Sequence, residues 1–361
     1  MNVTKLELIN FRNYSKYKID NICKKNIIIG KNGIGKTSIL EAIYVCSLAR
    51  SFKTNFEYNL IKHDTNCMKL KVEVEQENKT KKKLDYILNI NGKKTKINNN
   101  LKKKISDFIF QYKVILFSPD ELKIIRESPN VRRNYLNISL SQINKGYIKI
   151  LNSYNLLIKN KNEYLKKMYF NKYLDTKYLD VLDCKIVDLG LEIYEYRKNY
   201  IEMLNKYINK IFRKFKKDNF LYIKYNSQFE NKNKQQLLNM LKKNREKEIV
   251  LGLSKTGIHR DDIEFFHNNK NAKDFSSQGT QKLIILTLKL AELEMLINDY
   301  YETPILLLDD LFSELDIESQ NKIIKFLNDK VQIFITTTDV NNINKKLINK
   351  AKIINLNEEV K

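Results

Sequence analysis

The sequence predicts an α/β fold, a mixed sheet flanked by helices, into which a mainly helical second domain is inserted. Residues 3–11 and 68–75 alternate apolar and polar side chains, as half-buried strands do. A glycine-rich loop at 30–37 separates an apolar strand from a helical pattern, and a mixed α/β pattern returns after residue 248. We therefore predict one domain in two parts, residues 1–118 and 248–361, interrupted by a helical domain at 119–247.

The first part is rich in strands. LDYILNI and KKTKIN flank Asn91-Gly92, a dipeptide that favours tight hairpin turns. A further strand, VILFS, ends at Pro119. In the last part, IEFF precedes a polar loop at 274–280, followed by a helix at 280–298, a strand at PILLLDD, a helix from about 317 and a strand at VQIFITT.

The inserted domain shows apolar residues at helical spacing, and LYIKY (221–225) is its one candidate strand. Two sets carry the helical pattern: Tyr147, Ile150, Tyr154 and Leu157, then Ile186, Leu189, Ile193, Tyr196, Tyr200 and Met203. Such stripes most often form a core, and a base-stacking platform is the alternative. No heptad run is long enough to predict an extended coiled-coil arm.

Composition excludes several classes of protein. The 361 residues are 42% hydrophobic, enough for packed cores in about two domains. No signal-peptide core or membrane-length apolar run is present, so we expect a soluble cytoplasmic protein without membrane partners. Four scattered cysteines without CxxC spacing and only three histidines argue against a zinc site.

The formal net charge of +24 is typical of proteins that bind nucleic acid. Part of this excess reflects a bias typical of A/T-rich coding, because lysine, asparagine and isoleucine are all abundant. The nine arginines are better guides, since the planar guanidinium matches phosphate geometry. Five of them fall in or beside the segments discussed below: Arg12, Arg132, Arg133 and Arg260 lie within motifs, and Arg126 lies between LFSPDEL and SPNVRRNYLN.

The glycine-rich loop fits the phosphate-binding pattern GxxxxGK[ST]. Its residues are Gly30, Lys31, Asn32, Gly33, Ile34, Gly35, Lys36 and Thr37. It follows the strand NIII and opens the amphipathic pattern SILEAIYVCSLA, so its backbone N–H groups would surround phosphates at a helix N-terminus. We expect Lys36 to reach the β- and γ-phosphates of ATP and Thr37 to bind Mg²⁺.

The stretch ILLLDD complements this loop. A buried strand would deliver Asp309 to Mg²⁺ and Asp310 to the attacking water. An ordinary strand with an acidic turn is the alternative. A nuclease would need further acidic ligands and a second domain, and only 51 residues follow Asp310. Together the motifs predict a P-loop ATPase head.

A second polar loop, SSQGTQ at 276–281, opens a helix shortly before the acidic strand. It is a helix cap or a second anion site. In ABC-type ATPases a Ser-Gly loop at this position meets the γ-phosphate held by the other subunit, which would be the role of Ser277 and Gly279. The segment 312–316, FSELD, resembles the D-loop that lines the same dimer seam.

Residues 5 to about 338 resemble the RecF family of bacterial recombination mediators. The resemblance rests on LELINFRNY, the P-loop, LARSF, LFSPDEL, SPNVRRNYLN, GIHRDD, SSQGTQK, LTLKLAE, LLLDDLFSELD and QIFITTT. FSPDEL, VRRNYLN and HRDD are the most diagnostic, because transporter ATPases lack them. The resemblance implies an ABC-type P-loop ATPase head with an inserted helical domain. Because the strand VQIFI is followed by threonines and not by a histidine of the transporter switch type, we expect slow ATP hydrolysis, with ATP acting mainly as a clamp.

It further implies an ATP-dependent homodimer that binds single-stranded or gapped DNA. With RecO-like and RecR-like proteins, such a dimer helps to load recombinase in replication-linked repair and the SOS response. A head of the chromosome-organising or break-repair type is the alternative, but it would carry long coiled-coil arms. A transporter subunit would need a membrane partner and a switch histidine, and the strand VQIFI is followed by Thr336, Thr337 and Thr338.

For residues outside these loops, the family resemblance implies fewer and less specific roles. Arg12 is expected beside the P-loop, in reach of phosphate. Arg132 and Arg133 contact DNA or a partner, or form a structural ion pair. The residues His259, Arg260, Asp261 and Asp262 lie near the dimer seam or form a turn held by internal hydrogen bonds.

Several positions depart from the family pattern. Asn137 replaces the usual Asp after the paired arginines, which puts an ion pair there in doubt, and Ile258 replaces Pro before HRDD. Thr280 and Lys282 stand where Gln and Arg are typical, which weakens the expected grip of the Ser-Gly loop.

Overall fold

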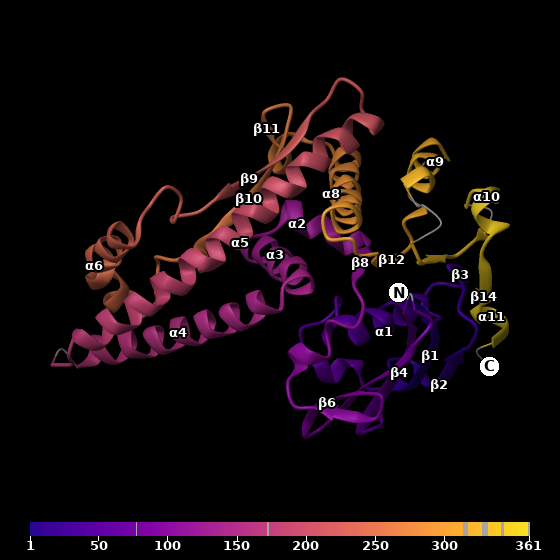
Figure 1. Cartoon of the computed structure of the whole chain (residues 1–361), viewed down its shortest axis with the longest axis horizontal. Coiled ribbons are helices and arrows are strands. Elements are labelled where there is room, and N and C mark those ends of the chain that lie inside the picture. The colour runs from indigo at the N-terminus through magenta and orange to yellow at the C-terminus, as the bar shows by residue number, and fades with distance from the viewer. Residues whose placement is uncertain (77, 172, 313–316, 327–330, 341–342, 360–361) are drawn as a thin grey trace. The chain divides into compact units, whose positions relative to one another are not determined.

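A computed structural model describes the chain except residues 77, 172, 313–316, 327–330, 341–342 and 360–361 (Figure 1). Its sheets and flanking helices confirm the predicted α/β class, but the single mixed sheet expected from the sequence is replaced, among the described residues, by sheets that are each purely parallel or purely antiparallel. The chain divides into two compact units. Unit 1 comprises Met1–Glu121, Lys214–Lys217 and Leu286–Lys361, and unit 2 comprises Leu122–Arg213 and Asp218–Ile285.

The second boundary between the units differs from the one predicted from the sequence. The sequence pattern placed this boundary at residue 247, whereas the units part between Ile285 and Leu286, inside one helix. The cause is strand pairing, because Asp262–His267 pairs with Leu221–Asn226 of the inserted segment. A return of mixed α/β character in the sequence therefore does not mark a return to the first unit.

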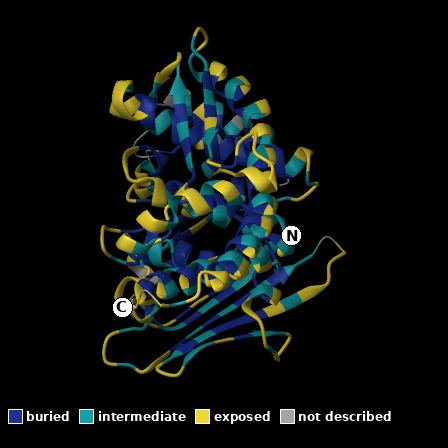
Figure 2. Cartoon of the chain, turned by 90° about the vertical axis from the view of Figure 1, so that its left-hand side faces the viewer, coloured by how far each residue is buried: buried dark blue, intermediate teal, exposed yellow. Residues whose placement is uncertain are grey.

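Unit 1 contains an antiparallel sheet. Its order is β2 (Tyr14–Ile19), β1 (Asn2–Phe11), β4 (Cys67–Glu75), β5 (Lys81–Asn89), β6 (Gly92–Ile97) and β7 (Asn100–Lys102). Burial alternates along β4, so one face is covered, and Figure 2 shows buried residues running along the strands. The predicted β5–β6 hairpin is present, with Asn89 opposite Gly92.

The second sheet of unit 1 is parallel, and four of its five strands are buried on both faces almost throughout. Its order is β14 (Lys352–Asn355), β3 (Lys25–Ile29), β13 (Ile333–Thr337), β12 (Ile305–Leu308) and β8 (Val114–Phe117). The buried side chain of Gln332 joins the sheets, because it exchanges hydrogen bonds of 2.7 and 2.8 Å with the backbone of Val3 in β1.

Helix α1 (Lys36–Leu48) contacts β4 and β5 of one sheet and β8 and β13 of the other. The sequence pattern suggested an amphipathic helix, but eleven of the 13 residues of α1 are buried. Two sheets cover it where a surface helix would meet only one. The other helical elements of unit 1 are η1 (Glu57–Leu60), η2 (Ile105–Asp107), α9 (Ile317–Phe326), α10 (Lys345–Ile348) and α11 (Leu356–Glu359), and η3 (Pro119–Leu122) ends at the unit boundary.

Unit 2 is mainly helical, with a small sheet of β11 (Lys270–Asn271), β10 (Asp262–His267) and β9 (Leu221–Asn226). Its helices are α2 (Lys123–Arg126), α3 (Pro129–Ile143), α4 (Lys145–Phe170), α5 (Lys177–Phe215, whose last residues belong to unit 1), α6 (Lys234–Leu251), η4 (Ile258–Arg260), α7 (Ala272–Phe275) and the start of α8 (Gln278–Asn298). Tyr147, Tyr154 and Tyr200 of the predicted stripes are fully or almost fully buried. They are core residues and do not form a base-stacking surface.

Two further features concern membranes and metals. Among the described residues, no helix combines the length and apolar character needed to cross a bilayer. The same residues hold no cluster of three or more His, Cys, Asp or Glu side chains arranged for a metal ion.

Candidate nucleotide-binding site

The predicted P-loop connects β3 to α1 in unit 1. Gly33 and Gly35 have positive φ values of 82° and 118°, a conformation that other residues rarely adopt. These two glycines let the chain turn back before the helix, and Gly35 becomes the N-cap of α1. The turn closes with a hydrogen bond of 2.9 Å from Ser38 N to Gly35 O. The first N–H groups of α1 are thus placed to bind an anion.

The ammonium group of Lys36 lies over this turn. It donates to Gly30 O at 2.7 Å and to Lys31 O at 3.2 Å, and only 4% of the residue is exposed. On the far side of the loop, Lys31 N donates to the side-chain oxygen of Asn357 at 3.1 Å. The positive charge of Lys36 is therefore held at the loop by neutral carbonyl groups.

Thr37 and Asp309 meet at the edge where the parallel strands end. Thr37 Oγ1 donates to Asp309 Oδ1 at 2.9 Å, and Thr336 Oγ1 donates to the same oxygen at 2.8 Å. Asp309 follows β12, and Thr336 belongs to β13, which lies between β12 and β3. A hydroxyl and a carboxylate oxygen are ligands that suit Mg²⁺. The sequence did not point to Thr336, because its position depends on the strand order.

Asp310 has a left-handed backbone, with φ of 48°. Its N–H donates to Thr336 Oγ1 at 3.0 Å, so one threonine orients both acidic residues. The role of Asp310 toward water stays a prediction. The predicted D-loop, residues 312–316, lies outside the described residues after Phe312.

Arg12 has a different neighbour from the one expected. Its guanidinium binds the carboxylate of Glu41 through two hydrogen bonds of 2.9 and 2.7 Å and donates to Asn59 O at 2.8 Å. Glu41 is wholly buried in α1 and also accepts from Ser51 at 2.5 Å. A buried carboxylate needs such partners. Arg12 therefore compensates the charge of Glu41, and its contact with phosphate stays a prediction.

The Ser-Gly loop belongs to unit 2 and opens α8. Thr280 N donates to Ser277 Oγ at 3.3 Å, so Ser277 caps the helix. The side chain of Gln281 anchors the loop from behind, because it donates to Ala272 O at 3.2 Å and accepts from Arg126 at 2.7 Å. Ser277 and Gly279 are exposed, and apart from its chain neighbours and its own turn of helix no described atom lies within 4 Å of the Cβ position of Gly279. The loop is fixed at its base and open at its tip.

The paired arginines of unit 2 are held by the HRDD motif. Arg132 forms hydrogen bonds of 2.6 and 2.9 Å with the two carboxylate oxygens of Asp262, and Arg133 donates to Asp261 O at 2.7 Å. Burial lowers the pKa of Arg133. Of the two alternatives left open for Arg132, the structure contains the ion pair.

Sequence reasoning missed the centre of this network, Arg197. The residue is 1% exposed and donates to Asp261 Oδ2 at 3.2 Å, to Ile258 O at 2.7 Å and to Asn137 Oδ1 at 3.1 Å. Asn137 Oδ1 thus accepts hydrogen bonds from Arg197 and, at 2.7 Å, from Tyr147 Oη in place of an ion pair. A signal was present, because Arg197 follows Ile193 by four residues and so falls on the apolar face of its helix.

His259 is also engaged inside unit 2. Its ring nitrogens lie 3.0 Å from Tyr154 Oη and 3.1 Å from Ser254 O. Burial lowers the pKa of His259 to about 4, with a smaller effect of the nearby positive charge of Arg260. Arg260 donates to Ser254 O at 2.7 Å. The motif is therefore a turn held by internal hydrogen bonds, as the second alternative had it.

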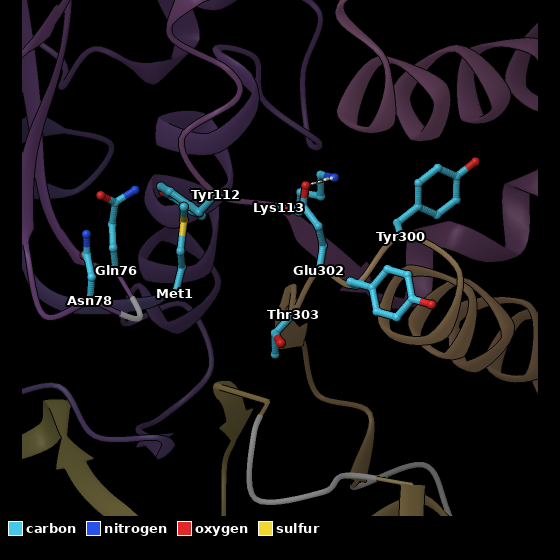
Figure 3. Close-up of a pocket in the computed structure, with 9 residues that line it drawn as sticks. Met1, Gln76, Asn78, Tyr112, Lys113, Tyr300, Glu302 and Thr303 are labelled. Carbon is cyan, nitrogen blue, oxygen red and sulfur yellow. Dashed lines mark ion pairs between the residues drawn. The ribbon is translucent and has the colours of Figure 1, made fainter.

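Unit 1 also contains a pocket of about 530 Å³ away from these motifs (Figure 3). The ion pair between Lys113 and Glu302, 2.8 Å long, lies on its wall. Both residues precede the strands β8 and β12, whereas the P-loop and Asp309 follow strands of the same sheet. The pocket is thus at the opposite edge of the sheet and does not belong to the candidate site.

Comparison with known proteins identifies close relatives. A family model described as "AAA domain, putative AbiEii toxin, Type IV TA system" matches residues 25–340. The curated DNA replication and repair protein RecF of Ligilactobacillus salivarius is 35% identical, over 99% of this chain and 96% of its own. The protein of the same name from Acholeplasma laidlawii is 38% identical, over 93% of both chains.

Solved structures give the same result. A structure described as the recombination mediator protein RecF-ATP in the RecFOR pathway superimposes with a TM-score of 0.89, at 32% identity, over 95% of this chain and 93% of that one. A structure described as the SmcHead bound to the C-winged helix domain of ScpA has a TM-score of 0.55 at 15% identity, over 98% of this chain and 93% of that one. The second likeness shows a shared head fold alone.

Proposed function

Because the chain belongs to the RecF family of DNA replication and repair proteins, we propose that it is an ATP-gated DNA-binding protein of recombinational repair. One observation carries the proposal. Lys36, Thr37 and Asp309 converge at one edge of the parallel sheet, and Thr37 Oγ1 lies 2.9 Å from Asp309 Oδ1. A nucleoside triphosphate with a bound divalent metal ion requires such an arrangement of lysine, hydroxyl and carboxylate.

The residues at this edge suit ATP with Mg²⁺. The N–H groups of α1 and the ammonium of Lys36 would bind the phosphates, and Thr37 with Asp309 would hold the metal. The metal would neutralise charge on the phosphate oxygens. Asp310, beside Asp309, would orient water for a weak ATPase reaction. With no histidine after β13, we expect ATP to act mainly as a dimerisation switch.

The exposed Ser-Gly loop supports a dimer. Ser277 and the open position at Gly279 would meet the γ-phosphate of a nucleotide bound to a second copy of the chain. Two nucleotides would then bridge two heads. This action of Ser277 and Gly279 across a dimer is a property of ABC-type ATPases that we extend to this chain.

The proposed DNA is single-stranded or gapped, bound by the basic surface that the net charge of +24 provides. By analogy with relatives assigned to the RecFOR pathway, RecO-like and RecR-like proteins are the proposed partners, and recombinase loading with SOS induction the outcome. A protein that acts on bacterial DNA would work in the cytoplasm, which is the proposed location.

The test measures affinity for single-stranded, duplex and gapped DNA, with and without ATP and Mg²⁺, together with light scattering. We expect salt-sensitive DNA affinity that rises with ATP while the chain dimerises. Lys36→Ala removes the buried ammonium and should weaken ATP binding roughly 100-fold. Lys94→Ala, at an exposed position in β6, is the charge-matched control and should bind ATP normally.

Two results would contradict the proposal. A wild-type protein that stays monomeric at saturating ATP and Mg²⁺ would remove the dimerisation switch. DNA affinity that is the same with and without ATP would separate nucleotide binding from DNA binding altogether.

A further inference from the structure

Tyr14, the first residue of β2, lies against the P-loop. A Cβ atom built on Gly35 would stand 2.5 Å from Tyr14 Oη and 2.8 Å from its Cζ. The phenol therefore occupies the space where a side chain of residue 35 would lie, at the N-terminus of α1. Gly35 directly precedes Lys36, so the hydroxyl is next to the groups proposed to bind phosphate.

The hydroxyl of Tyr14 is buried and polar. Only 4% of the residue is exposed, and the ring stacks on Tyr17 with centroids 5.1 Å apart. Within the part of the chain that the structure describes, Tyr14 Oη has no hydrogen-bond partner. Burial raises the pKa of Tyr14, so the group keeps its proton and remains a donor. A buried donor without an acceptor is costly, and such a group calls for an explanation.

The surroundings limit what the acceptor is. The P-loop and the first turn of α1 present N–H groups and the ammonium of Lys36, which are all donors. Two carbonyl groups of the loop already accept from Lys36. A phosphate group has only acceptor oxygens and would lie at this helix N-terminus.

We propose that Tyr14 is a nucleotide-binding residue, whose hydroxyl donates a hydrogen bond to a phosphate oxygen of the nucleotide held by the P-loop. The inference rests on the proposed function, because it requires a nucleotide at this loop. Gly35 then serves two purposes. It permits the turn of the P-loop with its φ of 118°, and it leaves room for the tyrosine that completes the phosphate contacts.

Tyr86 provides a matched control. Its hydroxyl is likewise buried without a described hydrogen-bond partner, and burial likewise raises its pKa. It lies in β5, and after burial and Glu57 the nearby Cys46 of α1 contributes to the rise in the pKa of Tyr86. Cys46 is eleven residues along α1 from Gly35, roughly 16 Å at the rise of an α-helix. Tyr86 therefore shares the buried hydroxyl with Tyr14 but not the position at the nucleotide.

The experiment compares Tyr14→Phe with Tyr86→Phe in two measurements, the melting temperature without nucleotide and the Kd for ATP and for ADP by titration calorimetry with Mg²⁺. Without nucleotide, both variants should melt at the wild-type temperature or above it, because each loses a buried donor that lacks an acceptor. Tyr14→Phe should weaken ATP binding about tenfold, whereas Tyr86→Phe should leave it within about twofold of wild type. An equal loss for ADP would place the acceptor on the α- or β-phosphate, and a loss for ATP alone would place it on the γ-phosphate.

A tyrosine with a purely structural role would not combine an unchanged or higher melting temperature with weaker ATP binding when it is replaced by phenylalanine. If Tyr14→Phe binds ATP as the wild type does, the proposal is wrong. A lower melting temperature of Tyr14→Phe without nucleotide would overturn it too, since the hydroxyl would then have a partner, such as a water molecule, before nucleotide binds. Failure of the wild-type chain to bind ATP would instead refute the proposed function, so the two failures are distinct.

Discussion

The edge of the parallel sheet in unit 1 and the charged network in unit 2 both gather ionisable residues, but they use them differently. At the sheet edge, Lys36 binds neutral carbonyl groups and Asp309 binds two hydroxyls. In unit 2, Arg132 is paired with Asp262, and Arg197 with Asp261. Opposite charges neutralise each other in the second region and stay apart in the first.

The difference separates a site from a scaffold. A buried ion pair with its hydrogen bonds satisfied has little left to offer a ligand, and breaking it leaves a charge in a medium that solvates it poorly. Charges that meet only neutral groups can exchange those contacts for a ligand of opposite charge. Substitutions in unit 2 should therefore alter stability, and those at the sheet edge should alter binding.

The largest effect is expected from Arg197→Ala. The substitution leaves Asp261 buried without its cationic partner, which should lower the free energy of unfolding by about 3–5 kcal/mol. Arg213→Ala removes an exposed arginine from the same helix and should cost at most about 0.5 kcal/mol. Urea unfolding of both variants checks the difference. Equal losses would mean that the network contributes no more than surface charge does.

A smaller effect is expected from acid. The pKa of His259 is about 4 in the folded chain, below the ordinary value of 6.5. Between these values the unfolded chain binds a proton that the folded chain does not, so the free energy of unfolding falls as the pH drops from 6.5 to 4, by about 3 kcal/mol in all. His259→Gln should flatten this dependence, and His63→Gln, at a 95% exposed side chain, should not. Urea unfolding at pH 4.5 and pH 7 measures it, and an unchanged slope in His259→Gln would exclude His259 as its source.

The fold class and the local motifs were predictable from the sequence because each depends on neighbours in the chain. Alternation along residues 68–75 and the GxxxxGK[ST] pattern act over a few residues, and β4 and the loop before α1 are where these patterns put them. The second domain boundary depends on the pairing of β9 with β10, which the sequence does not record. The burial of α1 likewise depends on two sheets that meet over it.

The candidate site was likewise predictable from the sequence only where its residues belong to local patterns. Lys36, Thr37 and Asp309 are named by their motifs, and the contact between Thr37 and Asp309 follows from neighbouring strands that end at one edge. Tyr14 and Thr336 lie in the segments LELINFRNY and QIFITTT, but their places at the site are found only through their contacts with Gly35 and Asp309. The motif around Arg12 did not show that this residue is paired with the buried Glu41, and its contact with phosphate stays a prediction.

The smallest effect on stability, and the sharpest test of the comparison, is expected from Asp309→Asn. An amide oxygen can still accept from Thr37 and Thr336, so the free energy of unfolding should change by less than about 1 kcal/mol. The amide is a poorer ligand for Mg²⁺ than the carboxylate, so ATP should bind more weakly in Mg²⁺ and unchanged in EDTA. Calorimetric titration under both conditions and urea unfolding measure the two quantities. A loss of several kcal/mol in stability would make Asp309 a scaffold residue like Asp261, and the distinction between the two regions would then fail.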